Sequence, residues 1–398
     1  MIINEEFYKY IQENADVESN RLRLSLSKKI LSFDGGFAVT QIECRRKYKS
    51  KFKNFLENPE FLFPDSTSAE QASSLSIARY HASLFPANQD ILDITAGLGI
   101  DSLTFAEKAA SVLSIELNPL KAEILKHNSK VLNLKNLNVE NSDSNEYLNS
   151  GDARFDIIFA DPSRRDSNNR RLYNLADCSP DVLKLQEKLQ EAAPKIFIKA
   201  SPLLDITQTC KDFKNIKAIR AVGVDGECKE VLIEIEREYN TSSGILYEAV
   251  NLDKEGNLIY VFSSSSKESS DIKFCNIEDI RIGSFLLEPS AMVMKLAPWG
   301  DICLKYKAKK FDKSSNLFVT DEYPANFPGR VTVIKKCLTK KDRKSLEGFP
   351  ASVVSRNYPV TADEIRKKFK LQEGNLNFIY ATRVNGKPMM YLSEAITN

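Results

Sequence analysis

Four acidic residues in the middle of the chain come at the ends of four successive apolar runs. Asp93 ends the run "DILD", Glu116 follows "SVLSI", Asp143 follows "LNVENS", and Asp161 ends "FDIIFAD". A carboxylate can accept hydrogen bonds from a ribose diol or an adenine amino group, and it attracts a cation. Each acid alone would be interpreted as a helix cap. All four together predict one pocket for an adenosine that carries a positive charge.

A loop with two glycines follows the first of these acids. In "DITAGLGID", Thr95, Gly97 and Gly99 come directly after Asp93. Glycine lets the backbone turn sharply and approach a ligand where a Cβ atom would clash. The spacing is not the G-x-G-x-x-G of dinucleotide enzymes, so pyrophosphate binding is not indicated. A phosphate-free, cationic nucleoside suits both the loop and the acids, and S-adenosyl-L-methionine is such a molecule.

Short apolar strands that alternate with helical patterns must position these residues. The runs "DILDI", "SVLSIEL", "LNVE", "FDIIFA" and "KIFIKAS" alternate with helical segments such as "PLKAEILKHNSKVLN". This alternation predicts an α/β domain with a parallel sheet that is covered by helices on both faces. We expect this Rossmann-like domain over residues 81–270, with its last two strands antiparallel. Ligands bind at the carboxyl ends of such strands, where the four acids lie.

The N-terminal region, residues 1–80, is predicted to be helical. Its segment "SAEQASSLSIARYHASLF" is expected to form one longer helix that is capped by Thr67 or Ser68. In the preceding stretch "CRRKYKSKFKNFLENP", Tyr48 and Phe52 alternate with lysines and arginines. That alternation favours stacking on single-stranded nucleic acid slightly over a solvated amphipathic helix.

The C-terminal region differs from the rest in charge. After the serine-rich segment 263–270 smaller β-α patterns resume, and we expect small α+β domains at 281–325 and 326–398. Residues 301–398 contain 19 lysines and arginines against 10 acids, whereas residues 81–300 contain 25 against 33. A basic tail beside an acidic middle indicates an appendage for a polyanion. A lysine-rich surface that only keeps the tail soluble explains the charge equally well.

Composition excludes several other classes of protein. The seven cysteines are scattered without a C-x-x-C pair, which argues against zinc or disulfides and predicts a reducing, cytoplasmic location. With two histidines, His81 and His127, a histidine-based metal site or triad is not expected. No apolar run approaches the ~20 residues of a membrane span, and the N-terminus is too polar for a signal peptide. Cys178 is interpreted as a core residue. The sequence predicts no oligomeric state.

Several motifs resemble known families. "DITAGLGID", "IELNP" and "FADPSRR" resemble the motifs of class I S-adenosylmethionine-dependent methyltransferases, especially those acting on RNA. Over nearly its whole length the chain resembles bacterial methyltransferases with a small ferredoxin-like domain and a C-terminal THUMP-like domain. "EPSAMVMK", "FPGRVTVI" and "SRNYPVTADEIRKKFKL" carry that likeness. The resemblance implies a methyltransferase that modifies a nucleotide in structured RNA, either tRNA or rRNA.

The resemblance also implies roles for the residues at the strand ends. In such enzymes the first acid and the glycine loop hold the methionine end of the cofactor, the second acid binds ribose, and the third meets adenine. The matching residues are Asp93, Gly97 and Gly99 for methionine, Glu116 for ribose, and Asp143 for adenine.

Two positions depart from the family pattern. Thr95 replaces the first glycine that usually follows the strand-end acid, and we include it among the cofactor-binding residues. Ser163 follows "DP" with no aromatic residue after it, whereas enzymes that methylate base amines often use an aromatic residue to clamp a flipped base. The base and the acceptor atom therefore stay open.

Catalysis is assigned to the end of the fourth strand. We expect Asp161 beside the methyl group, where its carboxylate can bind a substrate N–H and accept the proton. Pro162 stiffens the turn through its fixed φ. Arg164 and Arg165 suit phosphates that flank the target nucleotide, although they could instead pair with acids of the same domain. The alternatives are a protein or small-molecule methyltransferase, and an RNA-binding protein whose methyltransferase fold is not catalytic.

Overall fold

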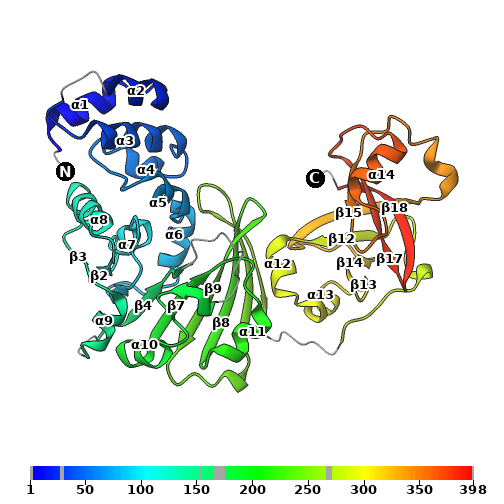
Figure 1. The fold of residues 1–398 in the computed structure, drawn as a ribbon. Coiled ribbons are helices and arrows are strands. Elements are labelled where there is room, and N and C mark those ends of the chain that lie inside the picture. The colour runs from blue at the N-terminus through cyan, green and yellow to red at the C-terminus, as the bar shows by residue number, and fades with distance from the viewer. Residues whose placement is uncertain (1–2, 27–30, 152–153, 165–174, 266–270, 397–398) are drawn as a thin grey trace. The chain divides into compact units, whose positions relative to one another are not determined.

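A computed structural model of the chain describes residues 3–26, 31–151, 154–164, 175–265 and 271–396 (Figure 1). Among these residues no helix is long and apolar enough to cross a membrane. The chain divides into two compact units. The first unit comprises Met1–Ile219, Glu230–Ser243 and Leu252–Asn257, and the second comprises Arg220–Lys229, Gly244–Asn251 and Leu258–Asn398.

The N-terminal region of the first unit is helical, as predicted. Its helices are α1 (Glu5–Glu13), α2 (Ser19–Leu26), α3 (Gly35–Lys47), α4 (Lys53–Leu56), α5 (Ser66–Gln71) and α6 (Leu75–Ser83). Phe7 and Phe37, from α1 and α3, stack with their ring centroids 5.8 Å apart in the small core of this region.

The prediction of one longer helix over "SAEQASSLSIARYHASLF" is wrong. Two helices form, because Asp65 caps α5 and Ser74 begins α6 by accepting the Ile77 N–H. Serine side chains compete for backbone N–H groups and therefore favour helix starts over helix interiors. The break places Ser73 between the two helices, where it lines the cavity described below.

The prediction that Tyr48 and Phe52 stack on nucleic acid is also wrong. Their exposed fractions are 8% and 0%, and both belong to the main core of the first unit. The neighbouring Arg45 donates to the backbone carbonyls of Pro59 and Phe61, so it holds the chain that follows α4. Tyr48 and Phe52 lie at the two ends of the turn between α3 and α4, and both rings point into the core.

Five neighbouring parallel strands form one side of a nine-stranded sheet, and the sequence predicts these strands. In spatial order they are β3 (Leu137–Glu140), β2 (Ser111–Ile115), β1 (Asp90–Asp93), β4 (Ile157–Ala160) and β7 (Lys195–Ala200). β9 (Glu227–Glu236) pairs antiparallel with β7. The order continues from β9 through β8 (Ile216–Val224), β10 (Leu246–Leu252) and β11 (Leu258–Ser264).

The order of the parallel strands positions a ligand site. The chain runs from β1 outward to β3 and then returns to β4 on the other side of β1, so the topology switches between β1 and β4. The crevice at the carboxyl ends of the strands beside such a switch is where open α/β sheets bind ligands. The connecting helices are α7 (Ile100–Phe105), α8 (Pro119–Val131), α9 (Ser144–Asn149), α10 (Gln186–Ala192) and α11 (Ile206–Asp212).

A second sheet organises the C-terminal part of the chain. Its seven strands, in spatial order, are β13 (Lys309–Asp312), β14 (Ser315–Thr320), β12 (Phe285–Pro289), β15 (Gly329–Cys337), β18 (Lys387–Ala395), β17 (Asn377–Val384) and β16 (Ser352–Ser355). The helices are α12 (Ala291–Leu296), α13 (Trp299–Lys305) and α14 (Ala362–Phe369). Because β15 pairs with β12, strands from both predicted small domains share one sheet.

Candidate active site

A cavity of about 490 Å³ lies at the carboxyl ends of the parallel strands, in the first unit. Seven of the predicted site residues line it together, namely Asp93, Thr95, Gly97, Gly99, Glu116, Asp143 and Asp161. Pro162 is not among the described residues that line the cavity, and the side chain of Arg164 and the whole of Arg165 lie outside what the structure describes. The functional roles assigned to all ten residues stay predictions.

Both glycines of the loop have a positive φ, and Gly99 is also closely packed. Gly97 has a φ of +57°, and a Cβ atom there would meet only a backbone oxygen at 3.9 Å. Gly99 has a φ of +85° and is the N-cap of α7, and a Cβ atom there would lie 2.2 Å from the Leu125 side chain. Positive φ favours glycine at both positions. Close packing of the helix against α8 adds a second reason at Gly99.

We expect Gly99→Ala to lower the free energy of unfolding by more than the ~1 kcal/mol that a left-handed alanine costs by itself. The reason is that the Leu125 side chain must also move to make room for the added methyl group. Gly226→Ala is the matched control, since Gly226 has a φ of +82° and open space around its Cβ position. Urea denaturation of both variants measures the difference. Equal losses would show that the contact with Leu125 has no energetic weight.

Asp93 is a buried structural acid as well as a cavity residue. Its side chain accepts from the Thr95 backbone N–H at 2.9 Å and from the Ser102 hydroxyl at 2.5 Å, and the residue is 2% exposed. Burial raises the pKa of this carboxyl to about 7, although the bonds from Ser102 and Thr95 oppose the rise. Asp93 is therefore partly protonated near neutral pH and holds the loop in place.

The next two acids also shape the loops beside them. Glu116 accepts from the backbone N–H of Gly97 at 2.7 Å and of Asn118 at 2.8 Å, which joins the loop after β1 to the end of β2. Asp143 caps α9 and accepts both the backbone and the side-chain N–H of Asn145, and these bonds lower its pKa. Each carboxylate oxygen has two lone pairs, so a cap can still accept from a ligand.

Thr95 connects the first strand to the fourth. Its hydroxyl oxygen accepts the backbone N–H of Asp161 at 2.6 Å. A glycine at this position could not make that bond. The departure from the family pattern therefore has a structural consequence, because the threonine fixes the backbone that carries Asp161.

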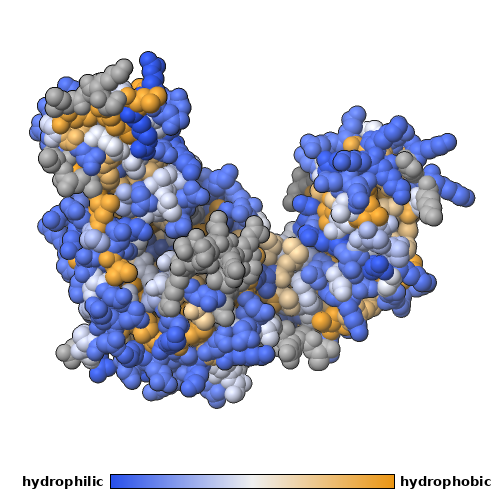
Figure 2. All heavy atoms as spheres, in the orientation of Figure 1, coloured by the Kyte–Doolittle hydropathy of each residue, from blue (hydrophilic) through white to orange (hydrophobic). Residues whose placement is uncertain are grey.

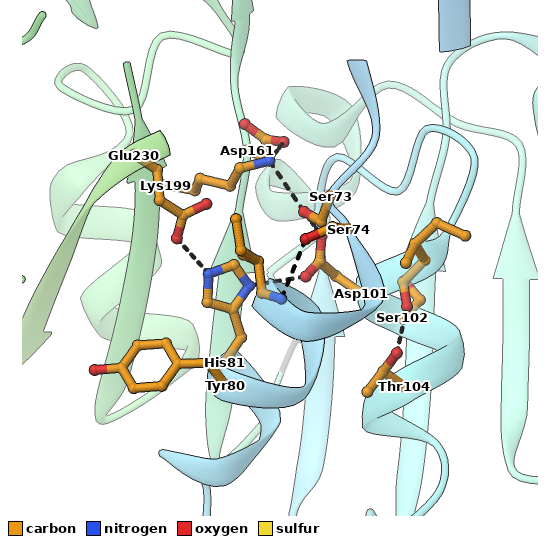
Figure 3. A network of polar contacts seen from close by, with 12 residues as sticks. Ser73, Ser74, Tyr80, His81, Asp101, Ser102, Thr104, Asp161, Lys199 and Glu230 are labelled. Carbon is orange, nitrogen blue, oxygen red and sulfur yellow. Dashed lines mark hydrogen bonds and ion pairs between the residues drawn. The ribbon is translucent and has the colours of Figure 1, made fainter. Parts of the chain in front are cut away.

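Asp161 is paired with a lysine that sequence reasoning missed. Lys199 Nζ lies 2.5 Å from Asp161 Oδ2, and the exposed fractions of the two side chains are 13% and 38% (Figure 3). The register of β4 and β7 aligns Ala160 with Ile198, so the residues that follow them lie side by side. The available signal was a lysine inside the apolar run "KIFIKAS". Burial raises the pKa of Asp161, although the Lys199 cation opposes it.

A chain of polar contacts continues from Lys199 into the core. Lys199 also donates to the Ser73 hydroxyl at 3.1 Å, and Ser73 donates to Asp101 at 2.6 Å. His81 contacts Asp101 through Nδ1 at 2.8 Å and Glu230 through Nε2 at 2.5 Å (Figure 3). Burial lowers the pKa of His81, but the two carboxylates outweigh it and raise the pKa to about 10. His81 is therefore a buried cation.

A second charged cluster lies in the C-terminal sheet. Glu288 on β12 is 9% exposed and lies 3.0 Å from Arg330 Nη1, 3.2 Å from Arg356 Nη2 and 3.2 Å from the Tyr380 hydroxyl. The guanidinium of Arg330 also lies over the Phe378 ring, 4.4 Å from its centroid. The motifs "EPSAMVMK", "FPGRVTVI" and "SRNYP" each supply one charged member of this cluster. We call it the Glu288 cluster.

The Glu288 cluster has one positive charge more than its carboxylate can neutralise. The side chains of Arg330 and Arg356 are 47% and 42% exposed. Some lysines of this region each pair with an acid, for example Lys335 with Glu394, Lys336 with Asp342, and Lys370 with Glu347. Most of the visible surface of the C-terminal domain is hydrophilic (Figure 2). The two arginines share one carboxylate and are therefore candidates for an anion contact.

Comparisons with known proteins match separate parts of the chain. Residues 285–328 match the model of a ferredoxin-like domain, and residues 327–395 match that of a THUMP domain-like family. An RNA methyltransferase of Mycoplasma mobile, described as uncharacterized, is 36% identical over 78 residues, which are 20% of this chain and 22% of that protein. Ribosomal RNA small subunit methyltransferase J of Coxiella burnetii is 35% identical over 131 residues, 29% of this chain and 50% of that protein. The chain thus spans half or less of the length of these curated relatives.

One solved structure matches the whole chain. It is a candidate methyltransferase from Porphyromonas gingivalis W83, with a TM-score of 0.86, 23% sequence identity and complete coverage of both chains. The chain therefore has the fold of that structure over its whole length. The chain carries a ferredoxin-like and a THUMP-like domain after that sheet and is related to RNA methyltransferases. These findings confirm the resemblance predicted from the sequence.

Proposed function

We propose that the protein is an S-adenosylmethionine-dependent methyltransferase that modifies a nucleotide in structured RNA, tRNA or rRNA, in the cytoplasm. The observation that carries the proposal is the single cavity into which the glycine loop, Glu116, Asp143 and Asp161 all open, at the switch point of a methyltransferase sheet. The likeness of parts of the chain to ribosomal RNA methyltransferases favours RNA over other substrates.

The residues around the cavity suit S-adenosylmethionine chemically. Glu116 at the end of β2 would accept from the ribose hydroxyls, and Asp143 at the start of α9 would accept from the adenine amino group. The loop at Gly97 and the acid Asp93 would hold the cationic methionine end. Bound there, the cofactor supplies an activated methyl group, so the protein mainly has to align the acceptor with it.

Asp161 would bind the acceptor of the methyl group. Its carboxylate lines the cavity and is 38% exposed, so a substrate N–H can reach it. The Thr95 hydroxyl accepts from the backbone N–H of Asp161, and Lys199 Nζ donates to its Oδ2. An aspartate whose pKa is raised by burial is a stronger base than an ordinary one, which suits the removal of a proton from nitrogen.

We expect cofactor binding to release part of a proton at about pH 6.5, because Asp93 is then partly protonated and a cation beside it lowers its pKa. Affinity should rise with pH through about 7, the pKa of Asp93. Calorimetry in two buffers with different ionisation enthalpies measures the release. Asp93→Asn is the control, since it has no proton to lose. If Asp93→Asn releases the same fraction of a proton on cofactor binding, the released proton does not come from Asp93.

The Glu288 cluster would contact the RNA backbone. Guanidinium groups are suited to phosphates, and here one buried carboxylate holds two of them half exposed. Backbone contacts of this kind position an RNA without reading its sequence.

The proposed function is tested by radiolabelled methyl transfer from S-adenosylmethionine to fractionated RNA from a strain that lacks the gene. We expect label in a tRNA or rRNA fraction and none in the protein fraction. Label in protein or in small molecules alone would support the alternative methyltransferases. Cofactor binding without transfer to any fraction would support an RNA-binding protein with a non-catalytic fold.

A further inference from the structure

The Asp161 carboxylate lies in a part of the first unit that is crowded with acids. Asp101 and Glu230 raise its pKa through their charges, and Asp93 interacts with it from the end of β1. In a buried site, like charges at this density favour protonation of one member. A protonated Asp161 could not accept a proton from a substrate. A nearby cation opposes this and favours the ionised form.

Two buried cations, His81 and Lys199, contact different members of this group of acids. His81 on α6 contacts both Asp101 on α7 and Glu230 on β9. Lys199 on β7 contacts Asp161 at 2.5 Å, and it reaches Asp101 through the Ser73 hydroxyl. The buried imidazolium thus compensates the deeper acids. The ammonium of Lys199 is left to compensate the acid that lines the cavity.

We propose that Lys199 is a positioning residue that keeps Asp161 ionised and holds its Oδ2 away from the cavity, so that Oδ1 can meet the substrate. This inference rests on the proposed function of Asp161 as the proton acceptor. Lys199 touches neither the methyl group nor the acceptor atom. Its effect passes through the carboxylate.

The transfer step then balances as follows. The acceptor nitrogen forms a bond to the methyl carbon, and the carbon–sulfur bond breaks with its electron pair left on sulfur. The N–H bond of the acceptor breaks, its electrons stay on nitrogen, and the proton goes to Asp161. Lys199 stays charged throughout, since three carboxylates surround it and raise its pKa despite burial.

The test is the titration of Asp161 itself in the cofactor-free protein. In carbon-13-labelled protein, the Asp161 carboxyl signal is identified by its loss in Asp161→Asn. We expect Lys199→Met to raise the pKa of Asp161 by at least about one unit, since a cation at this distance lowers a carboxyl pKa by about 1–3 units. Lys199→Arg should keep the pKa near that of the unaltered protein.

Activity supplies an independent readout. The basic form of Asp161 is required, so methyl transfer should rise with pH through the Asp161 pKa. Lys199→Met should move this acidic limb to higher pH by the same amount as the titration. Lys195→Met is the matched control, because Lys195 begins the same strand, at the end away from Lys199, and lies opposite Glu236 of β9 in the backbone register. We expect the acidic limb of the pH dependence to lie at the same pH in Lys195→Met as in the unaltered protein.

Several results would overturn the inference. One is an unchanged Asp161 pKa in Lys199→Met, and another is a uniform loss of activity with no movement of the limb. If Lys199→Met does not fold, Lys199→Gln is titrated in its place and must show the same rise. If the unaltered protein methylates no substrate, the proposed function fails, whereas the titration still decides whether Lys199 controls Asp161.

Discussion

Asp161→Asn is expected to lower the rate of methyl transfer about 100- to 10,000-fold, the usual contribution of a general base. Asparagine keeps the size of the side chain, and the backbone N–H of residue 161 can still donate to Thr95. The cavity should therefore keep its shape. Cofactor affinity should change far less than turnover. Single-turnover transfer and calorimetric binding measure the two quantities separately.

A matched control for this variant is Asp90→Asn. Asp90 is the first residue of β1, whereas the cavity lies at the carboxyl end of that strand. Its carboxylate accepts from the Ser111 hydroxyl. We expect it to leave turnover unchanged. In Asp161→Asn the Lys199 cation loses its partner, so Asp161→Asn/Lys199→Met tests whether any loss of cofactor affinity comes from that charge. If cofactor affinity and turnover fall equally, in Asp161→Asn and also in Asp161→Asn/Lys199→Met, then Asp161 binds the cofactor and not the acceptor.

Arg330→Gln/Arg356→Gln is expected to weaken RNA binding about 10- to 100-fold at ~0.1 M salt, as two phosphate contacts are lost. Each such contact releases counterions, so the slope of log affinity against log salt should flatten by about 1.5 to 2. Fluorescence anisotropy with a labelled RNA across a salt series measures both. Cofactor affinity should not change, because the cofactor cavity is lined by residues of the first unit alone.

The control for this pair is Lys307→Gln/Lys335→Gln, which removes the same number of charges from exposed ion pairs with Glu322 and Glu394. We expect it to change the slope much less. Because Glu288 would lose its partners in the arginine variant, Glu288→Gln/Arg330→Gln/Arg356→Gln is compared with it by thermal unfolding. A stable triple variant that binds RNA normally, or equal losses in arginine and lysine variants, would exclude the Glu288 cluster as an RNA contact.

The sequence alone determined the parallel part of the sheet and seven of the residues that line the cavity. Strands in a parallel sheet end on the same edge, so the acids that end four successive strands had to meet. Their periodicity and spacing were local features, readable without knowing how the chain packs. The motifs of the C-terminal region were recognisable for the same reason, and residues 285–395 match the two domain families they indicated.

Packing decided which side chains the acids contact. Lys199 lies beside Asp161 only because β4 and β7 pair in one register. His81 and Glu230 are 149 positions apart in the sequence and meet in the core. The Glu288 cluster likewise draws on separate strands of one sheet. A side chain's partners depend on long-range register, which no local pattern encodes.

Tertiary structure also decided between local alternatives that the sequence left balanced. Tyr48 and Phe52 could stack on a base or fill a core, and packing of the turn between α3 and α4 buries both in the core. The serines before α6 could extend a helix or begin one, and capping by Ser74 freed Ser73 to join Lys199 to Asp101. Local sequence determines which backbone conformations have a low free energy. The choice among them follows from the apolar area that the whole chain buries and from the charges that must then be compensated.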